Sequence, residues 1–364
     1  MLKGRALKIT VALAISTVAL TIVSLTLVGT IIILVASKSS TITNYVKTDF
    51  DNYEYRIALI SDDDAKSKNS SIYMSTYKEL KLYITNSLDA GRAIEDESQS
   101  HTLRGYLGNG DRGMQLSDLV EFNDNLLTIC DTTGILYKIR DNRALSPWLI
   151  LTMPSDKENW AEAPFQGEWM TVKDEKLLVG MNFIDDNSNG SEYMHVKEIS
   201  KSGDVVDVNW DEKYNKLKQA LNVSNNGFLT VHGCFWSSLT NKWIFALYTM
   251  DTTNSYDANS DQFTNIIIIA DETISEVTTL RVSNSSRGFT AIQPIPLSND
   301  KIFLGSKVER HDNHYKTYLT VFKTDGSVIM NDYEISFEHK FEGIAFLKID
   351  LFHFETPSVL YFNT

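Results

Sequence analysis

The amino-acid sequence predicts an all-β fold: a five-bladed β-propeller with one inserted helix, preceded by an N-terminal transmembrane helix. Three observations favour this fold: a strand motif that occurs five times, a repeat length typical of propeller blades, and one long uncharged stretch near the N-terminus. The motif consists of a small or acidic residue, an apolar strand, a tight polar turn and a second apolar strand. Its first copy is LSDLVEFNDNLLTIC, which begins at Leu116.

The motif returns four times downstream. The later copies are GEWMTVKDEKLLVG from Gly167, VHGCFWSSLTNKWIFAL from Val231, FTAIQPIPLSNDKIFLG from Phe289 and FEGIAFL from Phe341. The equivalent residues are Ser117, Glu168, His232, Thr290 and Glu342, separated by steps of about 51, 64, 58 and 52 residues. Repeats of about 40–50 residues with several strands each are typical of propeller blades. We therefore expect one propeller domain over residues 55–364.

Further elements are expected around the repeats. The stretch YRIALIS from Tyr55 predicts one strand, IYMSTYKELKLYI from Ile72 predicts a strand pair, and residues 86–106 are predicted to be a polar connection. Between the second and third repeats, NWDEKYNKLKQALNV has apolar residues at helical spacing and predicts one inserted helix. Asn209 is expected to cap this helix, because acidic residues occupy the first turn after it.

The N-terminus has a different composition. No charged residue occurs between Lys8 and Lys38. A transmembrane helix needs about 20 apolar residues, whereas the core of a cleaved signal peptide usually has about 7–15. We therefore predict a signal-anchor helix over residues 9–37, with a cleaved signal as the alternative. Basic residues precede the helix, so the positive-inside rule makes residues 1–8 a cytosolic tail and residues 38–54 a stalk on the other side of the membrane.

Composition restricts the partners and the compartment. The chain has 364 residues and a formal net charge of −13, which argues against a nucleic-acid partner. Sequons of the N-x-S type begin at Asn69, Asn189, Asn222 and Asn284, in agreement with a lumenal or extracellular glycoprotein. The two cysteines, Cys130 and Cys234, lie in predicted buried strands, and two buried thiols are favoured over a disulfide between them.

The repeat also predicts a site. The inner strands of a propeller surround a central channel, and equivalent residues of the blades project into it together. The residues expected to converge there are Ser117, Glu168, His232, Thr290 and Glu342. Carboxylate and hydroxyl oxygens together are ligands of a hard cation of the calcium kind. The alternative is that these residues only cap the starts of strands.

Eight motifs occur in the same order as in a known family. They are RGMQLSDL, TGILY, PWLIL, GEWMTVKDEKLLVG, NWDEKYNKL, CFWSS, RGFTAIQPIP and KFEGIAFL. Together they resemble the calcium-activated nucleotidase (apyrase) family over residues 55–347. The resemblance implies a five-bladed propeller that hydrolyses nucleoside di- and triphosphates with Ca²⁺ in its channel.

The resemblance also implies a location and particular site residues. Relatives are anchored in the endoplasmic reticulum and Golgi by an N-terminal helix or are secreted, so we expect a type II protein of that lumen or of the cell surface, secreted if the segment is cleaved. A homodimer is a further expectation. The implied metal ligands are Ser117, Glu168, His232, Thr290 and Glu342. The implied catalytic acids are Asp62, Asp64, Asp131 and Glu168, and the implied substrate-binding residues are Arg112, Trp169 and Arg287.

The chain departs from the family pattern at several positions. His232 replaces a family glutamate, and a histidine nitrogen is a poor ligand for oxygen-preferring calcium. The family motif DDRTG is CDTTG here, from Cys130, which removes an acid and an arginine. Phe183 and Ile184 follow LLVG where the family has a motif with a lysine and a tryptophan. Losing fixed cations predicts slow or absent hydrolysis, so the alternative function is a propeller that binds or scaffolds without catalysis.

Overall fold

The structure is a computed structural model that describes residues 42–43, 45–47, 52–63, 68–110, 112–141, 143–153, 163–182, 194–257, 262–283, 287–311 and 314–350. The chain divides into two compact units. Residues 44–347 form one unit, and residues 1–43 together with 348–364 form the other. In the unit of the two termini, β1 (Ile42–Thr43) pairs with β24 (Ile349–Asp350) in an antiparallel ladder.

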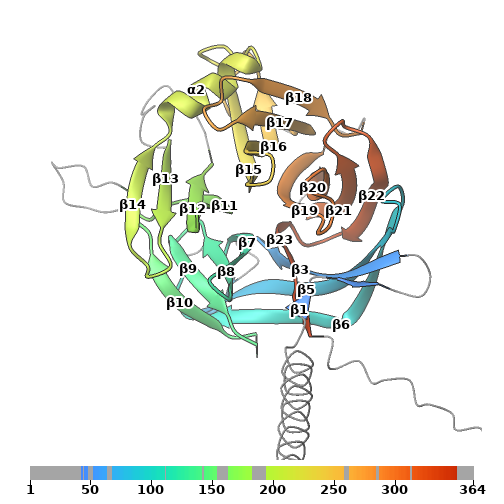
Figure 1. The fold of residues 1–364 in the computed structure, drawn as a ribbon. Coiled ribbons are helices and arrows are strands. Elements are labelled where there is room, and N and C mark those ends of the chain that lie inside the picture. Colours follow the sequence, from blue (N-terminus) through green and yellow to red (C-terminus); the bar gives the residue numbers. More distant parts are fainter. Residues whose placement is uncertain are drawn as a thin grey trace, which may run out of the picture. The chain divides into compact units, whose positions relative to one another are not determined.

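The unit of residues 44–347 consists of five antiparallel sheets around a common centre, so the predicted five-bladed propeller is confirmed (Figure 1). In four of these blades, four consecutive strands pair in sequence order, and the first strand lies innermost. The first blade contains β7 (Leu116–Phe122), β8 (Asn125–Cys130), β9 (Ile135–Ile139) and β10 (Leu145–Ile150). The second contains β11 (Gly167–Lys173), β12 (Lys176–Met181), β13 (His195–Ile199) and β14 (Val205–Asn209). The third contains β15 (Phe228–Ser237), β16 (Lys242–Asp251), β17 (Ile266–Asp271) and β18 (Val277–Arg281), and the fourth β19 (Gly288–Pro294), β20 (Ile302–His311), β21 (His314–Lys323) and β22 (Val328–Ser336).

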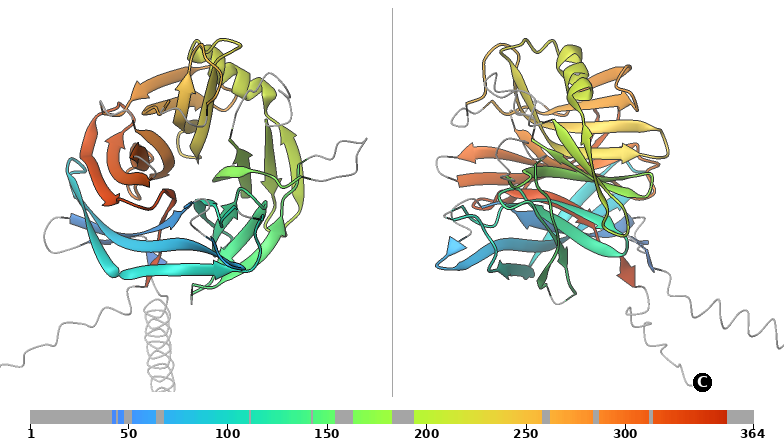
Figure 2. Two further views of the ribbon diagram at one scale, coloured as in Figure 1. Left: turned by 180° about the vertical axis from the view of Figure 1, so that it is seen from behind. Right: turned by 90° about the vertical axis from the view of Figure 1, so that its left-hand side faces the viewer.

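The fifth blade is assembled from both ends of the propeller sequence. Its innermost strand is β23 (Phe341–Phe346), which pairs antiparallel with β3 (Asn52–Ser61). β3 pairs with β5 (Ile72–Thr85), and β5 pairs with β6 (Gly91–Gly105). Two short strands, β2 (Val46–Lys47) and β4 (Lys68–Asn69), extend this sheet. The first and last strands of the propeller therefore share one sheet, and this sheet closes the ring (Figure 2).

The strands before the first repeat differ from the prediction. The strand pair predicted from Ile72 is wrong, because β5 is one continuous strand of 14 residues. The polar connection predicted over residues 86–106 is also wrong, since most of it is β6, a strand of 15 residues. A sheet strand with one face in solvent carries many polar side chains, and this is the position of β6 at the outer edge of its blade.

The apolar core lies between the blades. Five clusters of buried side chains occur in the described part of the chain, one at each junction between neighbouring blades. At the junction of the second and third blades, the rings of Trp169 and Trp210 lie 5.5 Å apart, and those of Trp210 and Trp243 lie 5.1 Å apart. Fully burying a large apolar side chain contributes about 1.5–3 kcal/mol, so each junction holds its two blades together. Cys130 and Cys234 are buried free thiols within these clusters, as predicted.

The predicted inserted helix is confirmed as α2 (Asp211–Ala220). Its cap differs by one position, because Trp210 and not Asn209 is the N-cap residue. Asn209 still supports the first turn, since its side-chain oxygen accepts a hydrogen bond from the backbone N–H of Asp211 at 2.7 Å. The buried side chains of Tyr214 and Leu217 fix the helix onto the core between the second and third blades.

The predicted signal-anchor helix over residues 9–37 lies outside the described residues. Within the described ranges, no helix is both long and apolar enough to cross a membrane. Of the four sequon asparagines, Asn69 and Asn222 are exposed, whereas Asn189 and Asn284 lie outside the described residues.

Candidate metal centre

A β-bulge recurs at one place in all five blades. In four of the innermost strands, the pairing ladder omits one residue near the strand start and resumes at the next, and in β15 it omits two, Thr230 and His232. The omitted residues include Ser117, Glu168, His232, Thr290 and Glu342. A bulge releases one side chain from the regular pleat and re-aims it. This repeated bulge is the structural basis of the periodicity in the sequence, and all five side chains are buried.

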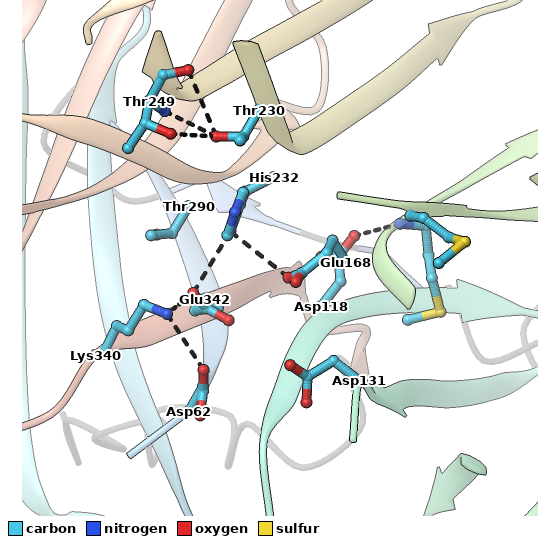
Figure 3. A network of polar contacts seen from close by, with 12 residues as sticks. Asp62, Asp118, Asp131, Glu168, Thr230, His232, Thr249, Thr290, Lys340 and Glu342 are labelled. Atoms are coloured by element: carbon cyan, nitrogen blue, oxygen red, sulfur yellow. Dashed lines mark hydrogen bonds and ion pairs between the residues drawn. The ribbon is translucent and has the colours of Figure 1, made fainter. Parts of the chain in front are cut away.

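Three of these side chains meet at the centre of the ring (Figure 3). Glu168, His232 and Glu342 each offer one ligand atom, and these atoms lie within 4.8 Å of one another. Nδ1 of His232 is 3.6 Å from Oε2 of Glu168 and 3.6 Å from Oε1 of Glu342. These separations are too long for hydrogen bonds, but donor atoms about 2.1 Å from one shared metal ion lie about 3.4–3.6 Å apart at tetrahedral to trigonal angles. Both distances from His232 are therefore compatible with ligands that share one cation.

The hydroxyl residues are placed differently from each other. Oγ of Ser117 is buried and has no hydrogen-bond partner, as is true of both ring nitrogens of His232. The hydroxyl of Thr290 instead donates a hydrogen bond to the backbone oxygen of Phe341 at 2.8 Å. A buried polar atom without a partner costs about 1–3 kcal/mol, and binding a cation would relieve this cost at Ser117 and His232.

These residues fit a divalent cation, but they fit calcium only in part. Glu168, Glu342 and Ser117 supply oxygen ligands. Calcium takes 6–8 oxygen ligands, and His232 places a nitrogen among them. The centre is consequently not the all-oxygen site that calcium favours.

A lysine that was not predicted lies within the same network. Nζ of Lys340 is 2.5 Å from Oε1 of Glu342 and 3.2 Å from Oδ2 of Asp62, so its ammonium joins two buried acids. It also lies 5.5 Å from the ring centroid of Tyr248, against which the ring of His232 packs at 4.1 Å. Lys340 stands two residues before Glu342, and residues at that spacing in extended chain face the same side. From this spacing the sequence could have indicated that Lys340 lies near Glu342.

Burial and neighbouring charges shift the pKa values of the three residues of the centre. Burial, followed by the charges of Asp131 and Glu342, raises the pKa of Glu168 well above its usual value. Burial is the largest single effect on Glu342 and acts to raise its pKa, but Lys340 and His232 together outweigh it and the net shift is downward. Burial lowers the pKa of His232, so its imidazole is neutral and has a lone pair available for a metal.

Two further predicted catalytic acids, Asp62 and Asp131, lie near this centre. Asp62 is buried and contacts Lys340, and Asp131 is close enough to influence the titration of Glu168 (Figure 3). Arg112, which is about half exposed, reaches Oδ2 of Asp131 at 4.0 Å. Asp64 lies outside the described residues.

Trp169 does not take the position that a substrate-binding residue needs. Its side chain is 0% exposed and belongs to the core between the second and third blades. Its indole N–H donates a hydrogen bond to the hydroxyl of Tyr214 at 3.3 Å. Adjacent residues of a strand face opposite sides, so Trp169 points into the core while Glu168 points into the channel. The burial of Trp169 does not agree with a direct contact to substrate.

Arg287 is engaged within the fourth blade. Its guanidinium pairs with Glu309 at 2.9 Å and with Asp332 at 2.7 Å, and it stacks 3.5 Å from the ring centroid of Tyr318. Asp332 also pairs with the fully buried Lys307 at 2.9 Å. Arg287 therefore balances charge in this network and is not available to replace the cations missing from the channel.

A cavity lies at the strands β5 and β6 of the fifth blade, and none of the five bulge residues lines it. It has a volume of about 400 Å³, and its lining includes Arg104, His314, His339 and Asp63. Nδ1 of His339 lies 2.9 Å from Oδ2 of Asp63, and this hydrogen bond raises the pKa of His339. Small-molecule sites typically have volumes of about 300–1,000 Å³.

Comparison with known proteins gives consistent matches. The family model described as Apyrase matches residues 61–347. An apyrase of Cimex lectularius is 32% identical over 313 residues, which cover 80% of this chain and 82% of that protein. Apyrase apy-1 of Caenorhabditis elegans is 31% identical over 303 residues, covering 80% and 84%. Soluble calcium-activated nucleotidase 1 of Mus musculus is 30% identical over 305 residues, covering 80% and 74%.

Proposed function

Since the chain belongs to the apyrase family, we propose that it hydrolyses the terminal phosphate of nucleoside di- and triphosphates in its central channel. The observation that carries this proposal is the meeting of Glu168, His232 and Glu342 at five-fold repeated bulges, with Asp131 and Asp62 beside them. A divalent cation held there would withdraw charge from phosphate oxygens.

The side chains of the channel have distinct parts in the reaction. Glu168, buried beside Asp131, would take a proton from water as the water oxygen bonds to phosphorus. The bond from phosphorus to the bridging oxygen then breaks, and the shortened nucleotide leaves with that oxygen. Asp131 holds the water beside Glu168. Lys340 supplies fixed positive charge within the channel, and Arg112 meets the phosphates at its mouth.

Calcium is the activating ion in the name of the mouse relative. We propose that calcium supports hydrolysis in this chain as well, but that it binds weakly because His232 supplies nitrogen in place of an oxygen ligand. Turnover is also slow, since Arg287 is engaged elsewhere and the family's lysine and arginine are missing. Losing one pre-organised charge donor typically costs about 10²–10³ in rate.

We further propose that residues 9–37 anchor the chain in a membrane of the secretory pathway, with the propeller on the lumenal or outer side. Asn69 is exposed, so we expect it to be glycosylated. Protease protection of the N-terminus in sealed microsomes, or a mature chain that starts near Lys38, would contradict this topology.

The test is phosphate release from UDP, GDP and ADP by the full chain purified in detergent, with and without calcium. The expected result is slow release that needs a divalent cation and is abolished in Glu168→Ala. Absence of release from every nucleotide, in a protein that still melts cooperatively, would overturn the enzyme assignment and favour the non-catalytic binding propeller.

A further inference from the structure

We propose that the central channel selects a borderline divalent transition-metal ion, of the Zn²⁺ or Co²⁺ kind, over calcium. The site consists of Glu168, His232 and Glu342, contributed by the second, third and fifth blades. The inference rests on the proposed function only in placing a cation in this channel. Metal selection is measured by binding, without any nucleotide.

The donor set is the first argument. It contains one imidazole and two carboxylates, and imidazole suits borderline metals whereas carboxylate and carbonyl oxygens suit calcium. Three protein ligands with a further open position are typical of catalytic zinc sites, which need four ligands in all. Calcium needs about 6–8 oxygens, and of the five bulge residues one, His232, offers nitrogen instead.

Charge is the second argument. The affinity of a calcium site depends on how many charged oxygen ligands it has. Glu342 shares its charge with the ammonium of Lys340 at 2.5 Å, so the centre offers calcium less than two full negative charges. A transition metal binds imidazole nitrogen well, and this attraction does not require ligand charge. Lys340 therefore weakens calcium more than it weakens zinc or cobalt.

The third argument is the environment of the His232 imidazole. Its side chain is buried, and neither ring nitrogen has a hydrogen-bond partner. One face of the ring packs against Tyr248 at 4.1 Å, which fixes its orientation towards the two carboxylates. A histidine that served only to pack would normally satisfy one nitrogen, because leaving it unsatisfied costs about 1–3 kcal/mol. Binding a metal through Nδ1, which is 3.6 Å from both carboxylates, supplies the missing partner.

The experiment is calorimetric titration of the full chain in detergent with Ca²⁺, Co²⁺ and Zn²⁺ chlorides, each alone. We expect one site per chain that binds Co²⁺ and Zn²⁺ at least tenfold more tightly than Ca²⁺. In His232→Glu the order should reverse, with tighter Ca²⁺ and at least tenfold weaker Co²⁺. The matched control is His311→Glu, which makes the same charge change at an exposed histidine and should leave all three affinities unchanged.

Cobalt adds a spectroscopic readout. Bound Co²⁺ should show a visible absorption band that changes in His232→Glu and stays the same in His311→Glu. Tighter binding of Ca²⁺ than of Co²⁺ by the wild type, or a band indifferent to His232→Glu in a variant that still melts cooperatively, would overturn the inference. If the metals bind as expected but no nucleotide is hydrolysed with any of them, the proposed function fails and the metal preference stands. If calcium binds tightly and drives hydrolysis, the metal preference fails and the proposed hydrolysis stands.

Discussion

Replacing Lys340 by methionine tests what balances the buried acids of the channel. The lysine ammonium lies 2.5 Å from Glu342 and 3.2 Å from Asp62, and the side chain of Glu342 is 1% exposed. Methionine keeps much of the aliphatic length and removes the charge. In the variant, Glu342 is buried beside a neutral His232 with no cation to compensate it.

The size of the effect follows from this burial. Breaking a buried ion pair by removing one partner costs about 3–5 kcal/mol, because the remaining charge is left without compensation. In a domain of this size 1 kcal/mol shifts the melting temperature by about 2–3 °C, so metal-free Lys340→Met is expected to melt roughly 6–15 °C below the wild type. A divalent cation replaces the lost positive charge. The stabilisation gained on adding Co²⁺ or Ca²⁺ should therefore be larger in the variant than in the wild type.

The assay is a thermal melt followed by intrinsic fluorescence, first with a chelator and then over a metal series. Lys340→Arg is the matched control, because it retains the charge and should melt close to the wild type. In the double variant Lys340→Met, Glu342→Gln the loss should be at least about 1 kcal/mol smaller than the sum of the single losses. Equal melting of Lys340→Met and Lys340→Arg, or simple additivity in the double variant, would refute this reasoning.

Three other predictions follow from described contacts. A Cβ at Gly180 would lie 1.9 Å from indole carbons of Trp169, so Gly180→Ala should lose about 1–3 kcal/mol, and a melt within 1 °C of wild type would contradict this packing. The hydrogen bond to Asp63 raises the pKa of His339, so its stabilisation is complete below its unfolded pKa of about 6.5 and is lost as pH rises through the folded value. Denaturation curves from about pH 6 to 8 should show this loss of stability in wild type and not in His339→Gln. The same pH dependence of the free energy of unfolding in both proteins would show that the His339–Asp63 pair is not the cause. Arg287→Gln should lower the melting temperature while turnover per folded molecule stays within about twofold, whereas a fall of more than tenfold would return Arg287 to the substrate site.

The sequence was sufficient for the inner part of each blade. Residues such as Glu168 and Glu342 recur once per blade, at steps of about 51–64 residues, and that repetition is visible in one chain. The outer strand β6 (Gly91–Gly105) could not be recognised in the same way. Its face in solvent selects polar side chains, and a polar strand resembles a polar loop when periodicity is the only guide.

The site was predicted less completely, because which neighbour a charged side chain meets depends on the whole ring. Lys340 and Asp62 are far apart in sequence, and only the pairing of β23 (Phe341–Phe346) with β3 (Asn52–Ser61) brings them within 3.2 Å. Arg287 begins a motif that suggested substrate binding, yet it pairs with Glu309 of β20 and Asp332 of β22 within the fourth blade. Trp169 could have been placed from strand alternation, which puts it opposite Glu168.

Closure of the ring through β23 also has a consequence for synthesis of the protein. This strand is the last of the propeller to leave the ribosome, and it brings Lys340 and Glu342 with it. Until then the inner edge of β3 is unpaired, and it can pair only after β23 has been translated. A product that stops before β23 has four complete blades and a fifth sheet without its inner strand, and it lacks Glu342. If the channel binds a cation as proposed, cation uptake would distinguish finished molecules from truncated ones, and degradation of chains with open sheet edges would remove those that lack the site.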